Sequence, residues 1–165
     1  MVKEVNLLLA GVGGQGTILM SELLGDAAVS DGLNVRGSEA LGMAVRGGPV
    51  VSAIRIGSEV YGPLIPMGKC DVLVGLELVE ALRNITYLSR SGSVILNTRS
   101  IAPFTVLAGK SVYPSLEKVV EKLSSVAREV VTLNASRIAE QAGSLLAANI
   151  VMLGALAGTG QIPIK

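Results

Sequence analysis

The sequence predicts an α/β fold: a Rossmann-like, three-layer arrangement with a mainly parallel sheet and one antiparallel hairpin. Apolar runs alternate along the chain with amphipathic stretches of helical period, which is the pattern of βαβ units. A glycine-rich turn follows the first apolar run, and the Gly-Ser pair at residues 57–58 has the form of a two-residue hairpin turn. The 165 residues contain no linker or internal repeat, so we expect a single domain over residues 1–165.

The chain opens with a strand, a turn and a helix. Residues 5–10 are apolar throughout and stop at glycines, which predicts a buried strand. Residues 17–29 place isoleucine, leucine and alanine on one side at helical spacing, and the Asp-Gly pair at 31–32 ends that helix. Residues 33–36 are expected to form a short second strand that completes a βαβ unit.

The next part of the chain is less regular. Residues 37–49 are rich in glycine and are expected to form an irregular segment. Residues 50–56 alternate as a strand, and the turn at 57–58 is expected to return the chain through an antiparallel strand at 59–61. The Pro-Leu-Ile-Pro segment at 63–66 predicts a rigid, extended connector.

Strands and helices alternate in the remainder. The apolar runs and helical periods there predict strands at 71–76, 93–97 and 129–133, and helices at 77–87, 115–128, 135–142 and 144–157.

The sequence contains few charged residues. Half of the residues are hydrophobic and only 16% are charged, against roughly 25% in an average soluble domain. Two compatible explanations stay open. Strands of a parallel sheet are buried on both faces, or the chain covers apolar surface with a partner, which could be a second copy when it is isolated.

Several classes of function and location are disfavoured. The net charge is +1 and there is no long basic or acidic run, so neither nucleic-acid nor membrane binding is indicated. The longest apolar tract, residues 145–158, is shorter than the about 20 residues that span a bilayer. No charged and apolar leader opens the chain, and the single cysteine, Cys70, gives no internal disulfide, zinc or iron–sulfur site. We expect a cytoplasmic protein.

The first turn is the strongest candidate for a binding site. In an open α/β sheet, ligands bind at the carboxyl ends of the strands, and residues 11–16 lie there. Their sequence, Gly-Val-Gly-Gly-Gln-Gly, has the spacing of a dinucleotide fingerprint. Glycines let the backbone approach a ligand, and the helix start offers N–H groups to an anion. The same glycines would also serve close packing of a helix on a strand, so both uses stay open.

The candidate ligand-binding residues at this edge are Gly11, Gly13, Gly14, Gln15, Gly16, Thr17, Glu39, Arg46, Gly47 and Asn97. Arg46 offers a planar fork that suits a phosphate or carboxylate. Glu39 is placed to meet a ribose hydroxyl, although it could equally pair with Arg46 or bridge to a partner. Asn97 could bind a ligand or form a turn at a strand end.

Other polar residues have simpler explanations. Glu77 and Glu80 suit a solvated first helical turn, Asn149 suits contact with a buried backbone group or a partner, and Cys70 suits the core. The chain has no histidine, no G-x-S-x-G elbow and no phosphate-loop lysine, which argues against an autonomous hydrolase or kinase. We assign no catalytic residue and no metal ligand to it.

These motifs together resemble the gamma-type subunit of 2-oxoacid:ferredoxin oxidoreductases. The resemblance rests on Gly-Val-Gly-Gly-Gln-Gly-Thr at 11–17, Gly-Met-Ala at 42–44 with Arg-Gly-Gly at 46–48, Pro-Leu-Ile-Pro at 63–66 and Asn-Thr at 97–98. It continues at residues 38–39, 71–73, 77, 80–83, 149 and 153–155. The pattern is most similar to the small beta subunit of the indolepyruvate enzymes and runs nearly the whole chain.

The resemblance implies a shared active site. Such enzymes oxidatively decarboxylate 2-oxoacids to acyl-coenzyme A and pass the electrons through iron–sulfur clusters to ferredoxin. It implies that thiamine diphosphate and the 4Fe-4S clusters are held by a larger partner subunit, and that this chain is inactive alone. Coenzyme A is then expected near the glycine-rich turn, with Gly13, Gly14, Gln15, Gly16 and Arg46 as the implied contacts.

The chain departs from the family pattern at two positions. Leu41 and Val45 stand where relatives often carry histidine and glutamine, so any contact of those two side chains with substrate or cofactor is lost in this chain. Relatives also usually continue for another helical segment, so an apolar groove, open or filled by a partner, is expected near the last residues. Two rival functions stay open: an independent NAD(P)- or flavin-binding oxidoreductase, and a non-catalytic assembly scaffold.

Overall fold

The computed structural model describes residues 2–165 and contains one mixed six-stranded sheet. The strands are β1 (Val5–Val12), β2 (Asn34–Leu41), β3 (Pro49–Gly57), β4 (Cys70–Gly75), β5 (Leu88–Asn97) and β6 (Glu129–Leu133), in the spatial order β2-β3-β1-β4-β5-β6. Five of them run in one direction and β3 runs against its two neighbours. The predicted fold class, mainly parallel with an antiparallel pair, is confirmed.

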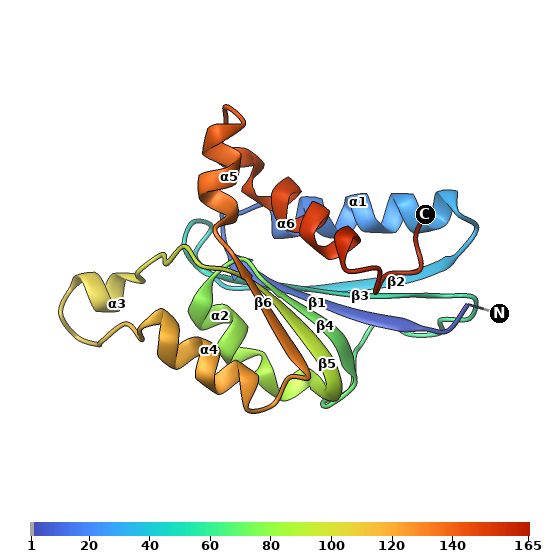
Figure 1. Cartoon of the computed structure of the whole chain (residues 1–165), viewed down its shortest axis with the longest axis horizontal. Coiled ribbons are helices and arrows are strands. Elements are labelled where there is room, and N and C mark those ends of the chain that lie inside the picture. Colours follow the sequence, from blue (N-terminus) through green and yellow to red (C-terminus); the bar gives the residue numbers. More distant parts are fainter. Residues whose placement is uncertain (1) are drawn as a thin grey trace.

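Helices cover both faces of this sheet, as Figure 1 shows. One face carries α1 (Thr17–Ser30), α5 (Ala135–Gln141) and α6 (Ala148–Gly158), and the other carries α2 (Leu78–Arg83) and α4 (Leu116–Ser124). A short helix, α3 (Phe104–Leu107), lies in the loop after β5, and 3₁₀ turns occupy Ile85–Tyr87 and Leu145–Ala147.

Strand β1 shows why the central strands are apolar runs. Leu7 and Leu9 pack into the core under α1 and α6, whereas Leu8 and Ala10 pack into the core under α2 and α4. Successive side chains of a strand point to opposite faces, so a strand between two helical layers needs apolar residues at every position. The first explanation of the apolar composition therefore holds for the centre of the sheet.

The antiparallel hairpin exists, but the predicted position was wrong. Strands β2 and β3 form it, paired from Asn34 opposite Gly57 to Leu41 opposite Val50, and residues 42–48 connect them. Residues 37–41 therefore belong to a strand rather than to an irregular segment. Because β1 and β2 occupy both edges of β3, a returning strand at 59–61 has no edge to pair with, and that segment leaves the sheet.

The helix predicted over residues 77–87 is shorter in the structure. It ends at Arg83, and Asn84 donates from its side-chain amide to the carbonyl of Glu80 at 2.8 Å. Side chains that bond to free carbonyls of a last turn stabilise a helix end. The chain continues as a 3₁₀ turn and enters β5 at Leu88, five residues before the predicted strand start.

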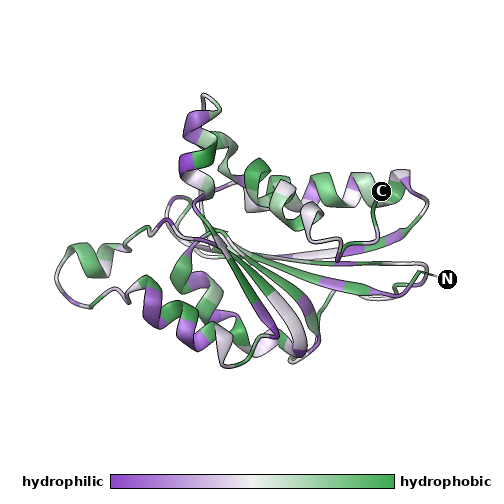
Figure 2. Cartoon of the chain, viewed as in Figure 1, coloured by the Kyte–Doolittle hydropathy of each residue, from purple (hydrophilic) through white to green (hydrophobic). Residues whose placement is uncertain are grey.

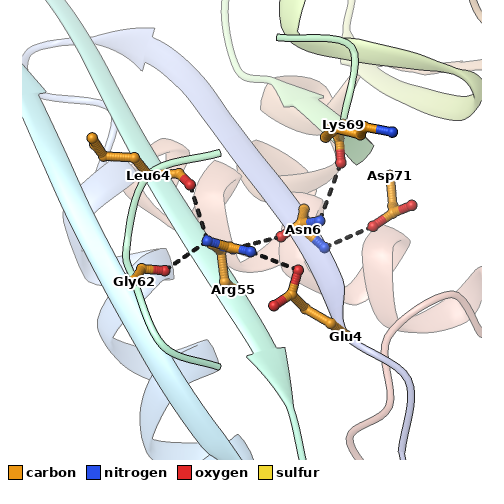
Figure 3. Close-up of polar contacts among 7 residues, drawn as sticks. All are labelled: Glu4, Asn6, Arg55, Gly62, Leu64, Lys69 and Asp71. Atoms are coloured by element: carbon orange, nitrogen blue, oxygen red, sulfur yellow. Dashed lines mark hydrogen bonds and ion pairs between the residues drawn. The ribbon is translucent and has the colours of Figure 1, made fainter. Parts of the chain in front are cut away.

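At the amino edge of the sheet, where the parallel strands begin, the side chain of Arg55 forms hydrogen bonds with four residues (Figure 3). Its guanidinium donates to Asn6 Oδ1 at 2.9 Å, to the carbonyls of Gly62 and Leu64 at 2.9 and 3.0 Å, and to Glu4 at 2.7 Å. It therefore fastens the connector after β3 to the start of β1.

Asn6 extends this network to β4, as Figure 3 also shows. Its backbone N–H donates to Asp71 Oδ2 at 2.8 Å, and its side-chain amide donates to the carbonyl of Lys69 at 3.2 Å. We call these residues, with Glu4 and Arg55, the amino-edge network. Within the described residues, no helix is long and apolar enough to cross a membrane.

Candidate functional site

The glycine-rich turn, residues 11–16, joins β1 to α1 at the carboxyl edge of the sheet, where the parallel strands end. Gly14 and Gly16 have φ values of +99° and +76°, a region that side chains disfavour. A Cβ on Gly16 would lie 2.3 Å from the amide nitrogen of Asn149, whereas one on Gly14 would meet nothing within 4 Å. The positive φ of Gly16 and its closeness to Asn149 both favour glycine at that position, whereas the space beside Gly14 is open.

The turn is bound to the loop that connects β2 and β3. The N–H of Gly13 donates to the carbonyl of Gly48 at 2.8 Å, and the N–H of Gly47 donates to the carbonyl of Gly13 at 3.2 Å. A Cβ on Gly13 would come within 2.3 Å of the carbonyl oxygen of Val45. The two motifs that the sequence singled out thus form one hydrogen-bonded unit.

Gln15 braces the turn from within. Its Oε1 accepts from the N–H of Val12 at 2.8 Å, and its Nε2 donates to the carbonyl of Leu76 at 2.9 Å. Both functional atoms of the amide therefore connect the turn to β1 and to the end of β4. The side chain fixes the shape of the site, and it still lines a cavity beside Gly14.

The start of α1 presents free donors. Gly16 is the N-cap and contributes no side-chain cap. Within residues 2–165, the N–H groups of Gly14, Gly16 and residues 17–19 have no hydrogen-bond partner, and the buried hydroxyl of Thr17 has none either. Unpaired N–H groups at the start of a 14-residue helix favour an anion, through direct hydrogen bonds and the helix dipole.

Arg46 and Glu39 do not pair with each other. Arg46 is exposed next to the turn, with its Cα 3.3 Å from the position of a Cβ on Gly13, and forms no ion pair within the described chain. Glu39 lies on β2, where Ser21 of α1 donates to it at 3.5 Å, and it lines neither cavity beside the turn. The structure brings Arg46 and Gly47 to the turn and leaves Glu39 apart.

Asn97 is buried at the end of β5, and its amide is fully used. Its Nδ2 donates to the carbonyl of Leu76 at 3.2 Å and lies 3.3 Å from the hydroxyl of Ser136, and its Oδ1 accepts from the N–H of Ala135 at 3.1 Å. These bonds hold the ends of β4 and β5 against the start of α5. Asn97 therefore shapes the carboxyl edge and borders the cavity beside Gly14.

Two cavities flank the turn, and Gly14 borders both. The larger, of about 510 Å³, is lined by Val12, Gly13, Gly14, Gly16, Thr17, Ile18, Leu41, Gly42, Ala44, Val45 and Val50. The smaller, of about 180 Å³, is lined by Gly14, Gln15, Leu76, Asn97, Arg99, Ile101, Ser136, Leu145, Leu146, Ala148 and Met152. Leu41 and Val45, where the sequence departs from the family pattern, both face the larger cavity and make it apolar.

The expectation of a solvated helical turn at Glu77 and Glu80 was wrong, because both side chains are buried. Glu77 caps α2 by accepting from the N–H groups of Val79 and Glu80 at 2.8 and 3.0 Å. Burial raises the pKa of Glu80, an effect that Arg83, at 2.9 Å, partly opposes. These carboxylates stabilise the end of β4 rather than a ligand.

Tyr113 contacts one of these buried carboxylates. Its hydroxyl donates to the carboxylate of Glu77, and burial followed by that carboxylate raises the pKa of Tyr113 above its usual value. It thereby fastens the long loop after β5 to the start of α2. Nothing in the local sequence marked this contact, because the partners are 36 residues apart.

Three residues at the edge were missed as site residues. Asn149 places its amide against Gly16, and Arg99 and Ser136 line the smaller cavity. Asn149 is a polar residue in an apolar helix, and the packing of α6 on α1 brings it to the turn. Cys70 is confirmed as a core residue: it is buried, and burial raises the pKa of its thiol to about 12.

Comparison with known proteins gives the context of this site. A family model described as pyruvate ferredoxin/flavodoxin oxidoreductase matches residues 6–165. The chain is 46% identical over 160 residues to the indolepyruvate oxidoreductase subunit IorB of Archaeoglobus fulgidus, covering 97% of this chain and 79% of that protein. It is 43% identical over 160 residues to the IorB subunit of Methanothermobacter thermautotrophicus, with 97% and 81% covered.

A solved structure shares the architecture. The pyruvate oxidoreductase subunit PORC of Thermotoga maritima superposes with a TM-score of 0.69 at 26% identity, over 98% of this chain and 79% of that one. The superposition therefore covers nearly the whole of this chain. Sequence and fold thus agree: the chain belongs to the pyruvate ferredoxin/flavodoxin oxidoreductase family.

Proposed function

We propose that this chain is the small subunit of a 2-oxoacid:ferredoxin oxidoreductase of the indolepyruvate type. The observation that carries the proposal is the unit formed by the glycine-rich turn and the loop 42–48 at an open edge of the sheet. It offers backbone N–H groups, the exposed guanidinium of Arg46 and an apolar cavity. These groups bind and position a ligand, and no nucleophile or proton-transfer residue stands among them.

Coenzyme A fits this edge as a ligand. The free N–H groups of Gly14, Gly16 and Thr17 would hold its diphosphate, and Arg46 would add a charge-assisted hydrogen bond. Asn97 and Gln15 would keep the turn in shape, and Val45 and Leu41 would form part of the apolar wall of the larger cavity. When bound, the coenzyme supplies the thiol that accepts the acyl group.

The rest of the reaction belongs to a larger partner subunit in this proposal. That subunit would hold thiamine diphosphate and the 4Fe-4S clusters, release CO₂ from the 2-oxoacid, and pass two electrons to ferredoxin. Support comes from exposed apolar side chains at the same edge: Met43 is 104% exposed, Val45 90% and Leu146 84%. Large apolar side chains gathered beside two cavities are typical of a surface that a partner covers.

The rival dinucleotide enzyme is disfavoured by the strand order. In a dinucleotide-binding fold the acidic residue lies at the end of the strand next to β1, but here β3 separates β2 from β1. Neighbouring strands lie about 4.8 Å apart, so Glu39 is displaced by one strand width from a ribose at the turn. The scaffold alternative is supported by the tight packing at Gly13 and Gly16. A measurement of coenzyme A binding distinguishes it from the proposed function, because a scaffold would bind no coenzyme.

The experiment is reconstitution. The chain is co-expressed with the product of the adjacent reading frame, the complex is purified, and 2-oxoacid- and coenzyme A-dependent reduction of ferredoxin is measured. We expect a stable complex that is active, and we expect no activity of the isolated chain. The isolated chain is expected to form a homodimer. Activity of the chain alone, or failure to bind a thiamine- and cluster-bearing partner, would refute the proposal. A cytoplasmic location is part of the same proposal and is tested by fractionating cells.

A further inference from the structure

A polar depression lies at the carboxyl ends of β5 and β6, next to the smaller of the two cavities beside the turn. It has a volume of about 510 Å³ and is lined by Thr98, Arg99, Ser100, Asn134, Ser136, Arg137 and Glu140. The lining therefore contains two guanidinium groups, three hydroxyls and one amide, and only one carboxylate, that of Glu140. The lining is net positive and rich in hydrogen-bond donors.

Neither arginine of this depression is used by the fold. Within residues 2–165, the side chains of Arg99 and Arg137 form no ion pair and no hydrogen bond, although Glu140 is only three residues from Arg137. At the opposite edge, by contrast, the guanidinium of Arg55 has four hydrogen-bond partners. Two unpaired guanidinium groups facing one depression are available to a ligand that carries more than one negative charge.

This depression is continuous with the glycine-rich turn. Arg99 and Ser136 line both the polar depression and the smaller cavity, and that cavity is bordered by Gly14 and Gln15. The two pockets adjoin at Arg99 and Ser136, and we call the pair the carboxyl-edge groove; its lining extends from Gly14, past Asn97, to Arg137. An elongated ligand with anionic groups at two separate points would fit it.

We propose that Arg99 and Arg137 bind a phosphate monoester at the far end of this groove. The proposal rests on the proposed function, because coenzyme A carries a diphosphate and, separately, a 3′-phosphate on its ribose. The diphosphate lies at the glycine-rich turn, and the 3′-phosphate lies between the two guanidinium groups. A phosphate monoester carries about −1.5 to −2 charges at neutral pH, which matches two arginines better than one.

The direct test uses a probe that does not depend on activity. Binding of adenosine 3′,5′-diphosphate to the full chain is measured by calorimetry for wild type, Arg99→Gln, Arg137→Gln and the control Arg128→Gln. Arg128 is also an exposed arginine but lies just before β6, at the amino edge. Loss of one charge-assisted bond is expected to weaken binding about tenfold in the first two variants, and Arg128→Gln is expected to bind as wild type does.

The second arm uses the complex. The KM for coenzyme A is expected to rise about tenfold in Arg137→Gln, and the KM for 3′-dephospho-coenzyme A is expected to stay unchanged. Arg137→Lys keeps the charge without the fork and is expected to fall between the two. Equal probe binding in all variants, or an equal penalty with both coenzymes, would overturn the site. A wild-type complex without coenzyme A-dependent activity would instead refute the proposed function, and the calorimetric arm would still decide the phosphate site.

Discussion

The two edges of the sheet use the same residue types in opposite ways. At the amino edge, Arg55 is surrounded by Asn6, Glu4 and two backbone carbonyls (Figure 3). At the carboxyl edge, Arg46 and Arg99 are exposed, and within residues 2–165 their side chains have no partner. A charged group that the fold needs is satisfied internally, whereas one that it leaves unpaired is free to bind. We infer that the amino edge stabilises the chain and that the carboxyl edge is available to a ligand.

Hydropathy shows a related contrast between helices (Figure 2). Helix α4 is coloured in alternating polar and apolar segments, and only Val119 and Leu123 of it are buried. Helix α6 is apolar along nearly all of its length, yet Ile150 remains about half exposed. A helix that is apolar on all sides is normally buried. Both explanations of the apolar composition therefore apply, one to the sheet and one to the surface beside the turn.

The largest expected effect is on stability at the amino edge. Arg55→Ala leaves Glu4, Asn6 and two carbonyls without their donor, and is expected to lower the free energy of unfolding by about 3 kcal/mol. For a chain of this size that corresponds to a fall in Tm on the order of 10 °C. Thermal unfolding of the purified chain measures it. The KM for coenzyme A of the surviving complex should not change, and a changed KM would contradict the division between the edges.

Gly13→Ala tests the join between the two loops of the site. The new Cβ would meet the carbonyl oxygen of Val45 at 2.3 Å, so the loops must separate. Overpacking of this kind is expected to cost about 2 kcal/mol and to weaken coenzyme A binding. Gly14→Ala is the matched control for crowding, since a Cβ there meets nothing, although its φ of +99° adds about 1 kcal/mol of strain. If both variants unfold at the same temperature, the contact with Val45 does not matter.

Arg46→Ala should do the reverse of Arg55→Ala. Because its side chain forms no ion pair within the described chain, Tm is expected to change by less than about 1 °C. The KM for coenzyme A is expected to rise about tenfold through loss of one charge-assisted bond. Steady-state kinetics of the complex measure it. An unchanged KM would mean that Arg46 meets the partner rather than the coenzyme.

The smallest effect concerns Tyr113 and pH. Its pKa is raised in the folded state, by burial and by Glu77. The stabilisation that follows is complete below the usual tyrosine pKa of about 10 and is lost as pH rises from there through the folded pKa. Tyr113→Phe is expected to cost about 1 kcal/mol at neutral pH and to unfold with a weaker alkaline dependence than wild type. Parallel pH–stability curves for the two proteins would contradict this assignment.

The sequence predicted the parts that depend on local pattern. The apolar runs of β1 and β4 and the glycines of the turn define their elements within a residue or two, because burial on both faces and tight turns each demand particular residues. The hairpin was misplaced because pairing is non-local. Gly57 and Ser58 have the residues of a turn, but a strand can follow only if one edge of β3 is free. In this sheet β1 and β2 pair with both edges of β3.

The site was predicted in part for the same reason. Arg46 and Gly47 were expected near the turn, and the structure places them there through two backbone hydrogen bonds. Asn149 and Arg137 could not be placed, since their position depends on how α5 and α6 pack above the ends of β5 and β6. Whether the predicted ligand-binding residues contact coenzyme A stays a prediction.

The most direct measurement of the central contrast is hydrogen–deuterium exchange of the complex with and without coenzyme A. Peptides that cover residues 11–19 and 42–48 at the carboxyl edge are expected to exchange more slowly when the coenzyme is present. Peptides that cover residues 58–69, which the amino-edge network fastens, are expected to exchange at the same rate in both states. Protection confined to residues 58–69, or none at residues 11–19 under saturating coenzyme, would contradict the account.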